Sequence, residues 1–468
     1  MSMLLTSRAC VLLLMAAATV AQAQPVTPIG PLQVPLPAPV VAPVPAPTPT
    51  MALPVPEGCE ATPPAALTWQ AAQARLLACN RELVAAQRAI EGVAADRITA
   101  GQRPNPNLSA GIGSINPQLG VGSGPVWQKA VDSSVRYEQL IERGGKRSLR
   151  LRGAEAQFGA ALQDRREVAR SQRLLLADAM TELAALDARI AVLVEVTDLY
   201  AQAGRANARR VSRGDMAPID AQRQAIETAR AAADLQQARV DAQRSRLVLA
   251  ALLAWESQAA ALNVDPSVLE PPSVDVALDT VERRPDLVAA RLRVDAARAA
   301  RELAIAQATR DVTVGVQVNH FPSTPQNSSG NGNSVSVSMG VPLFVNHRFE
   351  GEIARATSDL RTAEGARQRL LASAYADVVR INADVSAARS RLELLQTQQV
   401  ALAEQVAQAA ERGYTRGALT VLELLDARRV LRQTRLDVLT ARAELARATL
   451  ARNVALRASG YGDSDVAP

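Results

Sequence analysis

Two stretches of strict alternation lie on either side of a loop between residues 311 and 349. The first places Val312, Val314, Val316 and Val318 between small polar residues, and the second does the same with Val335, Val337, Met339 and Val341. A period of two puts the apolar and polar sets on opposite faces of a sheet. Each stretch has about the 9–11 residues that a tilted strand needs to cross a bilayer. A soluble hairpin with one face on a core would look the same locally, so the stretch alone leaves both interpretations open.

A weaker copy of this pattern predicts another hairpin at about 107–140. Leu108, Ala110 and Ile112 alternate with Ser and Gly, and Val135 and Tyr137 alternate with polar residues on the return. Aromatic residues lie near the predicted strand ends, either as scattered core packing or as in the interfacial belts of membrane strands. The sequence places Trp127 and Phe321 beside the hairpin loops, and Tyr137 and Phe344 at the opposite ends.

A long helical pattern follows each hairpin, at about 146–212 and about 348–413. Each contains apolar residues at steps of three and four, as in a coiled coil. The first seam is Leu176, Met180, Leu183, Ile190 and Val194, and the second is Leu392, Leu395, Leu402, Val406 and Ala409. Sixty-odd residues at about 1.5 Å rise make a rod of roughly 100 Å.

The chain contains an internal duplication with a nearly constant offset. Gly111 and Gly315 are separated by 204 residues, whereas Arg213-Gly214 and Arg416-Gly417 are separated by 203. Chance similarity between Ala-rich helices would not keep strands, glycines and turns in step. Each repeat therefore reads as a half-length helix, a β-hairpin, a full-length helix, a turn and another half-length helix.

The predicted segments cover the whole chain. They are a signal peptide (1–23), a Pro-rich linker (24–66), repeat 1 (67–257, with its tip at 213–217), an irregular equatorial segment (258–284), repeat 2 (285–458, with its tip at 415–419) and a tail (459–468). The signal has Arg8, an apolar core and a small-residue cleavage site. The linker holds about half of the chain's 27 prolines, which favour an extended tether.

The amino-acid composition disfavours some classes of protein but does not identify one. Aromatic residues make up 3% of the chain, and the net charge of +6 is spread along helices that also carry many acids. No basic block with interleaved aromatics suggests nucleic acid.

Cys59 and Cys79 remain after signal cleavage, and in an oxidising compartment they either pair or stay as two unrelated thiols.

Four predicted strands per chain force an inference about assembly. A spanning sheet leaves no edge in lipid, and the smallest familiar barrels need about eight strands. The chain therefore has to oligomerise to close one.

These features resemble the TolC family of outer-membrane efflux ducts over about residues 67–458. The motifs that carry the resemblance are Leu67-Thr68-Trp69-Gln70-Ala71, Arg284-Pro285-Asp286-Leu287, the strand-to-helix joint Val341-Pro342-Leu343-Phe344 and the two Arg-Gly turns. The resemblance implies a mainly α fold with a transmembrane β-barrel contribution. It implies four strands per chain in a trimeric 12-stranded barrel, a periplasmic α-helical tunnel, and docking on a periplasmic adaptor joined to an inner-membrane RND pump.

Within that family, the stretch Ile141-Glu142-Arg143-Gly144-Gly145-Lys146-Arg147 is similar to the joint of the Czc-type heavy-metal efflux branch. That similarity implies export of heavy-metal cations through the outer membrane of a Gram-negative bacterium, with multidrug or other small-molecule efflux as the alternative. The same stretch also has a purely structural interpretation. Gly144 and Gly145 would turn the chain, and Lys146 and Arg147 would lie at the polar edge of the membrane.

Candidate functional residues fall into three groups. They are the adaptor-docking tips Arg213, Gly214, Asp215, Arg416, Gly417 and Leu419, the strand-to-helix joints Gly144, Gly145 and Pro342, and the cysteines Cys59 and Cys79. At both tips, an equally simple interpretation is that the glycines only make turns.

Two other classes of protein compete with a passive duct. A periplasmic coiled-coil adaptor would carry a compact β domain beside one helical hairpin, rather than two similar hairpins. An enzyme is disfavoured because no nucleophile elbow, metal-ligand spacing or phosphate loop appears. The sequence therefore predicts no catalytic, metal or cofactor site, and the family resemblance implies a homotrimer.

Overall fold

The structure of the protein is a computed structural model. It describes residues 56–115, 123, 125, 131–272, 278–322 and 332–457. The predicted signal peptide, most of the Pro-rich linker, Trp127 and the predicted tail lie outside the described residues.

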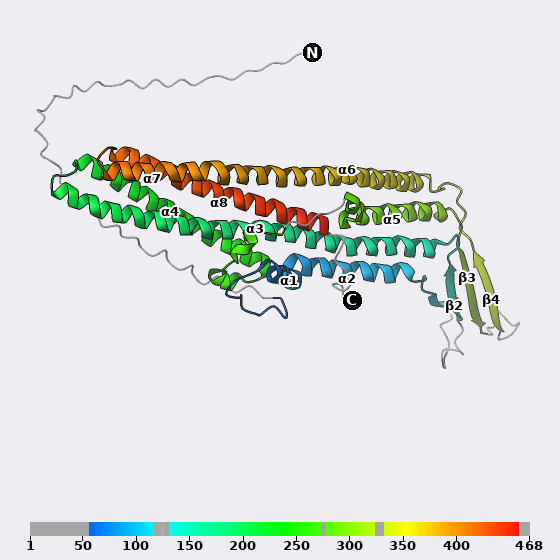
Figure 1. The fold of residues 1–468 in the computed structure, drawn as a ribbon. Helices are drawn as coiled ribbons and strands as arrows, with labels where there is room; N and C mark the ends of the chain where they lie inside the picture. Colours follow the sequence, from blue (N-terminus) through cyan, green and yellow to red (C-terminus); the bar gives the residue numbers. More distant parts are fainter. Residues whose placement is uncertain are drawn as a thin grey trace, which may run out of the picture. The chain divides into compact units, whose positions relative to one another are not determined.

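The chain runs twice through the same series of elements (Figure 1). The first series comprises α1 (Trp69–Cys79), α2 (Arg81–Gly101), β1 (Asn107–Gly113), β2 (Asp132–Ile141), α3 (Lys146–Ser212) and α4 (Pro218–Leu253). The second comprises α5 (Pro285–Gln307), β3 (Val312–Phe321), β4 (Gly332–Gly340), α6 (Glu350–Leu394), η5 (Leu395–Val400), α7 (Ala401–Thr415) and α8 (Val421–Arg457). Three 3₁₀ segments join them: η2 (Glu256–Ala261), η3 (Pro266–Leu269) and η4 (Leu278–Arg283).

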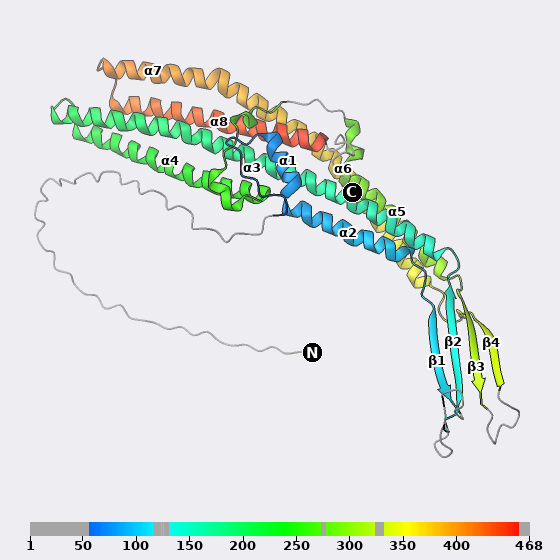
Figure 2. The ribbon, with the colours of Figure 1, turned by 90° about the horizontal axis from the view of Figure 1, so that it is seen from below.

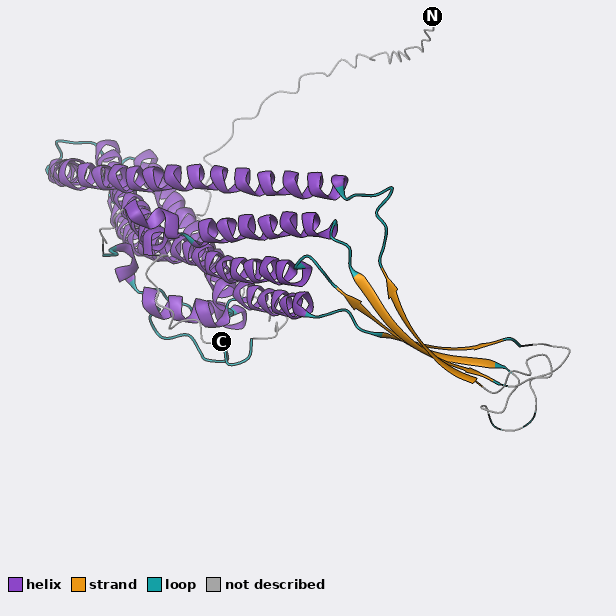
Figure 3. Cartoon of the chain, turned by 90° about the vertical axis from the view of Figure 1, so that its right-hand side faces the viewer, coloured by secondary structure: helices purple, strands orange, loops and turns teal. Residues whose placement is uncertain are grey.

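The four strands form one antiparallel sheet in the order β1-β2-β3-β4 (Figure 2). Both hairpins have the same register. Gly111 pairs with Ser134, and Gly315 pairs with Ser338, so both members of the pair keep the 204-residue offset. Figure 3 shows the strong twist of these strands, which is the right-handed twist that paired strands adopt.

Helix α3 is a single element of 67 residues, about 100 Å long at the usual rise. It packs along α5 and α2 near the sheet and along α4 and α8 farther away. The predicted seam of α3 is buried where these helices meet, because Leu176, Met180 and Leu183 are fully buried.

The second rod differs from its prediction. A π-helical turn, η5, separates α6 from α7 and inserts one extra residue into the helix. After Leu395, which is buried, the buried positions are therefore Ala403 and Ala407 rather than Leu402 and Val406. Leu402 is 60% exposed and Val406 is 54% exposed, so beyond the π turn the predicted seam residues are not buried within a single chain.

The opening helix is also interrupted. The pattern from Leu67 to Gln102 predicts one helix, but Asn80 ends α1 and caps α2. Its side-chain oxygen accepts hydrogen bonds from the backbone N–H groups of Glu82 (3.0 Å) and Leu83 (3.3 Å), as at a helix N-cap. Its amide nitrogen donates to the Leu252 carbonyl at 3.0 Å, which ties the break to the end of α4.

The largest hydrophobic core lies where α1, α3, α4 and α8 meet the 3₁₀ segments η2 and η3. Leu67 enters it through a parallel bridge to Val264, with a hydrogen bond of 2.8 Å from its N–H to Asn263. The fully buried residues of this core include Leu76, Leu176, Met180, Leu183, Leu249 and Leu253. None of the described helices is long and apolar enough to cross a membrane.

Candidate functional site

The joint between β2 and α3 is made by two consecutive glycines in left-handed conformation. Gly144 has φ +71° and Gly145 has φ +69°. Residues that have a Cβ adopt this left-handed backbone conformation only at an energetic cost. A Cβ on Gly144 would lie 2.9 Å from the Cβ of Thr309, so glycine is required there for space as well as for conformation. The two glycines turn the strand into the helix while the end of α5 packs against them.

Lys146, the first residue of α3, fastens this joint to the other repeat. Its ammonium group is largely buried and donates to the Thr309 carbonyl (2.8 Å) and to the Asp311 carboxylate (2.8 Å). Asp311 also accepts a hydrogen bond of 2.9 Å from the backbone N–H of Arg143. The Lys146–Asp311 pair therefore ties the strand-to-helix joint of repeat 1 to the helix-to-strand joint of repeat 2.

Hydrogen bonds and nearby positive charges favour the ionised forms of two carboxylates at this joint, Asp311 and Glu142. Burial alone would raise the pKa of Asp311, but the hydrogen bonds from Lys146 and Arg143 outweigh it and lower that pKa. The hydrogen bond that Arg150 donates, 2.9 Å between Nη2 and Oε2, lowers the pKa of Glu142. The ion pairs therefore persist across the neutral range.

The joint of repeat 2 reaches the same backbone geometry without glycine. Phe349 caps α6 with φ +67° and ψ +20°, whereas Gly145 caps α3 with φ +69° and ψ +17°. The ring of Phe349 packs edge-on against Phe344, with centroids 5.1 Å apart. Pro342 lies exposed just beyond the end of β4, where its missing N–H leaves no donor with which the strand pairing could continue.

Both helix tips end in the same hydrogen-bonded motif. Gly214 has φ +80° and Gly417 has φ +73°. In each tip, the glycine N–H and the next N–H bond back to carbonyls of the last helical turn. These pairs are Gly214–Val211 (3.0 Å), Asp215–Arg210 (2.8 Å), Gly417–Tyr414 (3.0 Å) and Ala418–Gly413 (2.8 Å). This is the Schellman arrangement, in which a left-handed glycine closes a helix.

The tip residues differ in how far they are exposed. The predicted residues Arg213, Gly214, Asp215, Arg416 and Gly417 are all exposed, and a Cβ on either tip glycine would meet no atom within 4 Å. Leu419 is half-buried instead, against the small apolar cluster that is formed by Ala410, Leu424, Ala427 and Tyr414. Leu419 thus packs within its own hairpin more than it faces outward.

A contact between the two repeats lies just inside the tips. Arg210 donates to the Tyr414 hydroxyl at 2.8 Å, and its guanidinium carbon lies 5.4 Å from the centre of the same ring. The end of α3 is thereby linked to the end of α7.

The sheet has one apolar and one polar face. Val316 pairs with Val337 and Tyr137, and Gln317 pairs with Ser336 and Arg136, so like residues share a face in all neighbouring strands. The paired register also corrects one expectation, because Tyr137 lies in the middle of β2 rather than at its end.

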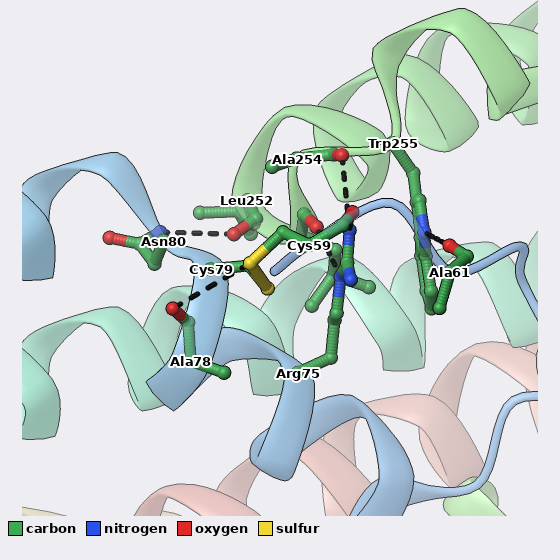
Figure 4. Close-up of a disulfide and its surroundings, with 10 residues drawn as sticks. Cys59, Ala61, Arg75, Ala78, Cys79, Asn80, Leu252, Ala254 and Trp255 are labelled. Atoms are coloured by element: carbon green, nitrogen blue, oxygen red, sulfur yellow. Dashed lines mark hydrogen bonds between the residues drawn. A yellow bond between two sulfur atoms is a disulfide. The ribbon is translucent and has the colours of Figure 1, made fainter. Parts of the chain in front are cut away.

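Cys59 and Cys79 form a disulfide, with their Cα atoms 5.8 Å apart (Figure 4). Arg75 reinforces it, because its guanidinium donates to the carbonyls of Cys59 (2.5 Å) and Leu253 (3.0 Å) and stacks on Trp255. Burial lowers the pKa of Arg75. The end of the predicted linker, residues 56–66, is thus fixed to α1 and to the end of α4.

Sequence reasoning missed the Lys146–Asp311 pair and the Arg75 contacts. Asp311 directly precedes a clear strand and Lys146 directly follows two glycines, which is the available signal for the first pair. No comparable signal exists for Arg75. Among the described residues, no group of three or more His, Cys, Asp or Glu side chains is arranged to hold a metal ion.

The duplicated repeat, the four-stranded sheet and the helical rods define the class: this is the fold of the TolC-like outer-membrane efflux channels. Residues 278–456, which are essentially the second repeat, match the family model described as outer membrane efflux protein. The resemblance drawn from the sequence motifs is therefore confirmed.

Individual relatives are similar over most of the chain. The cobalt-zinc-cadmium resistance protein CzcC of Cupriavidus metallidurans is 25% identical over 381 residues, which cover 80% of this chain and 86% of that protein. The outer membrane protein VceC of Vibrio cholerae superposes with a TM-score of 0.69 at 20% identity, covering 83% of this chain and 95% of that one. The outer-membrane channel OprN superposes with a TM-score of 0.69 at 23% identity, covering 84% and 90%.

Proposed function

We propose that this protein is the outer-membrane duct of a tripartite efflux system and that it conducts heavy-metal cations passively. The observation that carries the proposal is the combination of this channel fold with similarity to a cobalt-zinc-cadmium resistance protein along 80% of the chain. A duct need not bind what it passes, so conduction needs no built metal site.

Three copies are the proposed working unit. Each chain supplies a four-stranded sheet with two free edges, β1 and β4. Such edges present unpaired N–H and C=O groups that lipid cannot satisfy. Pairing β4 of one copy with β1 of the next closes the sheet with twelve strands and leaves every edge paired.

The two tips are the proposed docking surface for a periplasmic adaptor, itself joined to an inner-membrane RND pump. Their exposed residues and open glycines leave backbone accessible at the end of each rod that lies farthest from the sheet. Two similar tips per chain would give six docking points around a trimer. The hydrogen-bonded geometry also makes both tips rigid enough to present a defined surface.

Metal resistance in cells tests the proposal. A strain that retains a metal-exporting pump and its adaptor but lacks their outer-membrane partner is complemented with this gene, and survival is scored in cobalt, zinc and cadmium. Restored resistance, with the protein in the outer-membrane fraction as a cross-linkable trimer, supports the duct. If resistance to antibiotics returns but resistance to metals does not, the duct serves the multidrug alternative. A monomer outside the membrane fraction contradicts the proposal.

A further inference from the structure

The polar face of the sheet carries very few charges. Among its described strand residues, only Asp132, Arg136 and Glu138 are charged, and the rest are mostly Ser, Gly, Asn and Gln. Asp132 lies at the loop end of β2, whereas Arg136 and Glu138 lie in its middle.

The two central charges are paired with each other. Arg136 and Glu138 form an ion pair along the strand, as residues two apart on one face can do. The Arg136 guanidinium also reaches across β3 and donates to the Ser338 hydroxyl of β4 at 3.4 Å. Its Nε is shielded from solvent and has no acceptor, and the carboxylate of Glu138 compensates the positive charge through the ion pair.

Gly315 provides the space in which these side chains lie against the sheet. It pairs with Glu138 on one side and with Ser338 on the other. A Cβ at this position would lie 2.7 Å from Oγ of Ser338 and 3.3 Å from Cγ of Glu138. Gly315 is itself buried, because the neighbouring side chains cover it. The ion pair is therefore held flat over a glycine instead of projecting from the sheet.

We propose that the Arg136–Glu138 pair determines the ion selectivity of the duct. The inference rests on the proposed function, in which the polar face lines the lumen of a three-chain duct. Three self-neutralising pairs then lie at one level of a wall whose only other charged residue, among the described strand residues, is Asp132 at the loop end of β2. Cations and anions both pass this level without being held, because each charge is compensated within its own chain. Removing one member of the pair exposes three like charges in the lumen.

The size of the effect follows from Coulomb's law. Twelve strands about 4.8 Å apart and tilted by about 40° close at a radius of roughly 12 Å, which places the charged groups ~10 Å from the axis. Three unpaired carboxylates at that distance raise the local concentration of a monovalent cation about twofold at 0.1 M salt and about fivefold at 0.01 M. Unpaired guanidinium groups act by the same factors on anions.

The test is the reversal potential of the purified full-length oligomer in a planar bilayer under a KCl gradient. We expect Arg136→Gln to shift the potential toward cation preference, Glu138→Gln to shift it toward anion preference, and both shifts to grow at low salt. The double variant R136Q/E138Q is the matched control, because it removes both charges and should return the potential close to that of the parent protein. The amount of assembled oligomer is measured for each variant.

Each outcome separates the two proposals. If the parent protein assembles but conducts no ions, the duct function fails. If it conducts and both single variants keep the parent potential, the duct stands and the selectivity role is overturned. If R136Q does not assemble, E138Q alone and the double variant still decide the question, since an anion shift in the first and none in the second supports the role. Equal potentials in these two variants overturn it.

Discussion

Replacing Lys146 by Met removes the buried ammonium group that links the two joints. The Thr309 carbonyl and one oxygen of Asp311 then lose their donor at 2.8 Å. Breaking a buried ion pair on one side costs about 3–5 kcal/mol when the remaining charge has no other partner. Here the Asp311 side chain is 21% exposed and keeps the N–H of Arg143. We therefore expect a loss of about 2–3 kcal/mol, near that of a charged hydrogen bond.

An ion pair six residues farther along α3 provides the matched control. Arg152 and Glu302 also join the two repeats, at 2.9 Å, but their side chains are 62% and 39% exposed. Solvent screens such a pair, so Arg152→Met should cost less than about 1 kcal/mol. The measurement is the guanidinium midpoint of the purified oligomer, followed by far-UV circular dichroism, for the parent and both variants. Equal midpoints for K146M and R152M would refute the claim that burial makes the Lys146 pair special.

Acid should remove the difference in stability between the parent protein and K146M. Hydrogen bonds hold the pKa of Asp311 below its ordinary value in the folded chain, so this carboxylate contributes stability that is fully present above its unfolded pKa of about 3.9. That stability is lost as the pH falls through the lower, folded pKa. The difference between the guanidinium midpoints of the parent protein and K146M should therefore be constant from pH 5 to 8 and should shrink below about pH 4. A gap that stays constant in acid would show that Asp311 is not the group that Lys146 stabilises.

Three further predictions concern the tips, the strand faces and the disulfide. Gly214→Asp should abolish metal resistance and adaptor co-purification while leaving the trimer intact, because the site is exposed and open. The control Gly204→Asp, on the side of α3, should retain both metal resistance and adaptor co-purification. Resistance that survives G214D would exclude the docking role. Val337→Arg should strongly reduce the assembled protein, at a cost of about 2–4 kcal/mol for a lipid-facing site, and Ser336→Arg on the other face should not. Equal assembly would refute the assignment of faces. Cys59→Ser opens a loop with a sequence separation of 20 residues and should destabilise the linker attachment by about 3 kcal/mol, measured as faster proteolysis between residues 56 and 66. Unchanged proteolysis would mean that the Arg75 contacts suffice.

Local signals made much of the fold predictable. The alternation of Val312 to Val318 identified a strand with two different faces, and the paired register has the same alternation. The Arg-Gly turns were recognisable because only a left-handed residue closes the helix there, and glycine adopts that conformation most easily. These features depend on neighbours within a few residues, so a single sequence contains them.

Features that depend on distant residues were not predictable. Lys146 and Asp311 are 165 positions apart, and Arg75 donates to a carbonyl 178 positions away. The break at Asn80 looks like a helix interior in sequence, since its cap and its bond to Leu252 exist only after α1 and α4 have packed. Phe349 adopts a positive φ that its residue type disfavours, so no local rule indicates it.

The π turn shows how one inserted residue changes which surface a helix offers. Heptad spacing placed Leu402 and Val406 in the seam, but η5 rotates the helix so that alanines take the buried positions. The first rod, α3, has no such turn, and the two rods therefore present different faces despite the duplication. A single chain leaves Leu402 and Val406 more than half exposed, so both remain available for contact with a neighbouring copy in the proposed trimer. The duplication thus provides two similar tips and two similar hairpins, and the π turn makes the helices that connect them unequal.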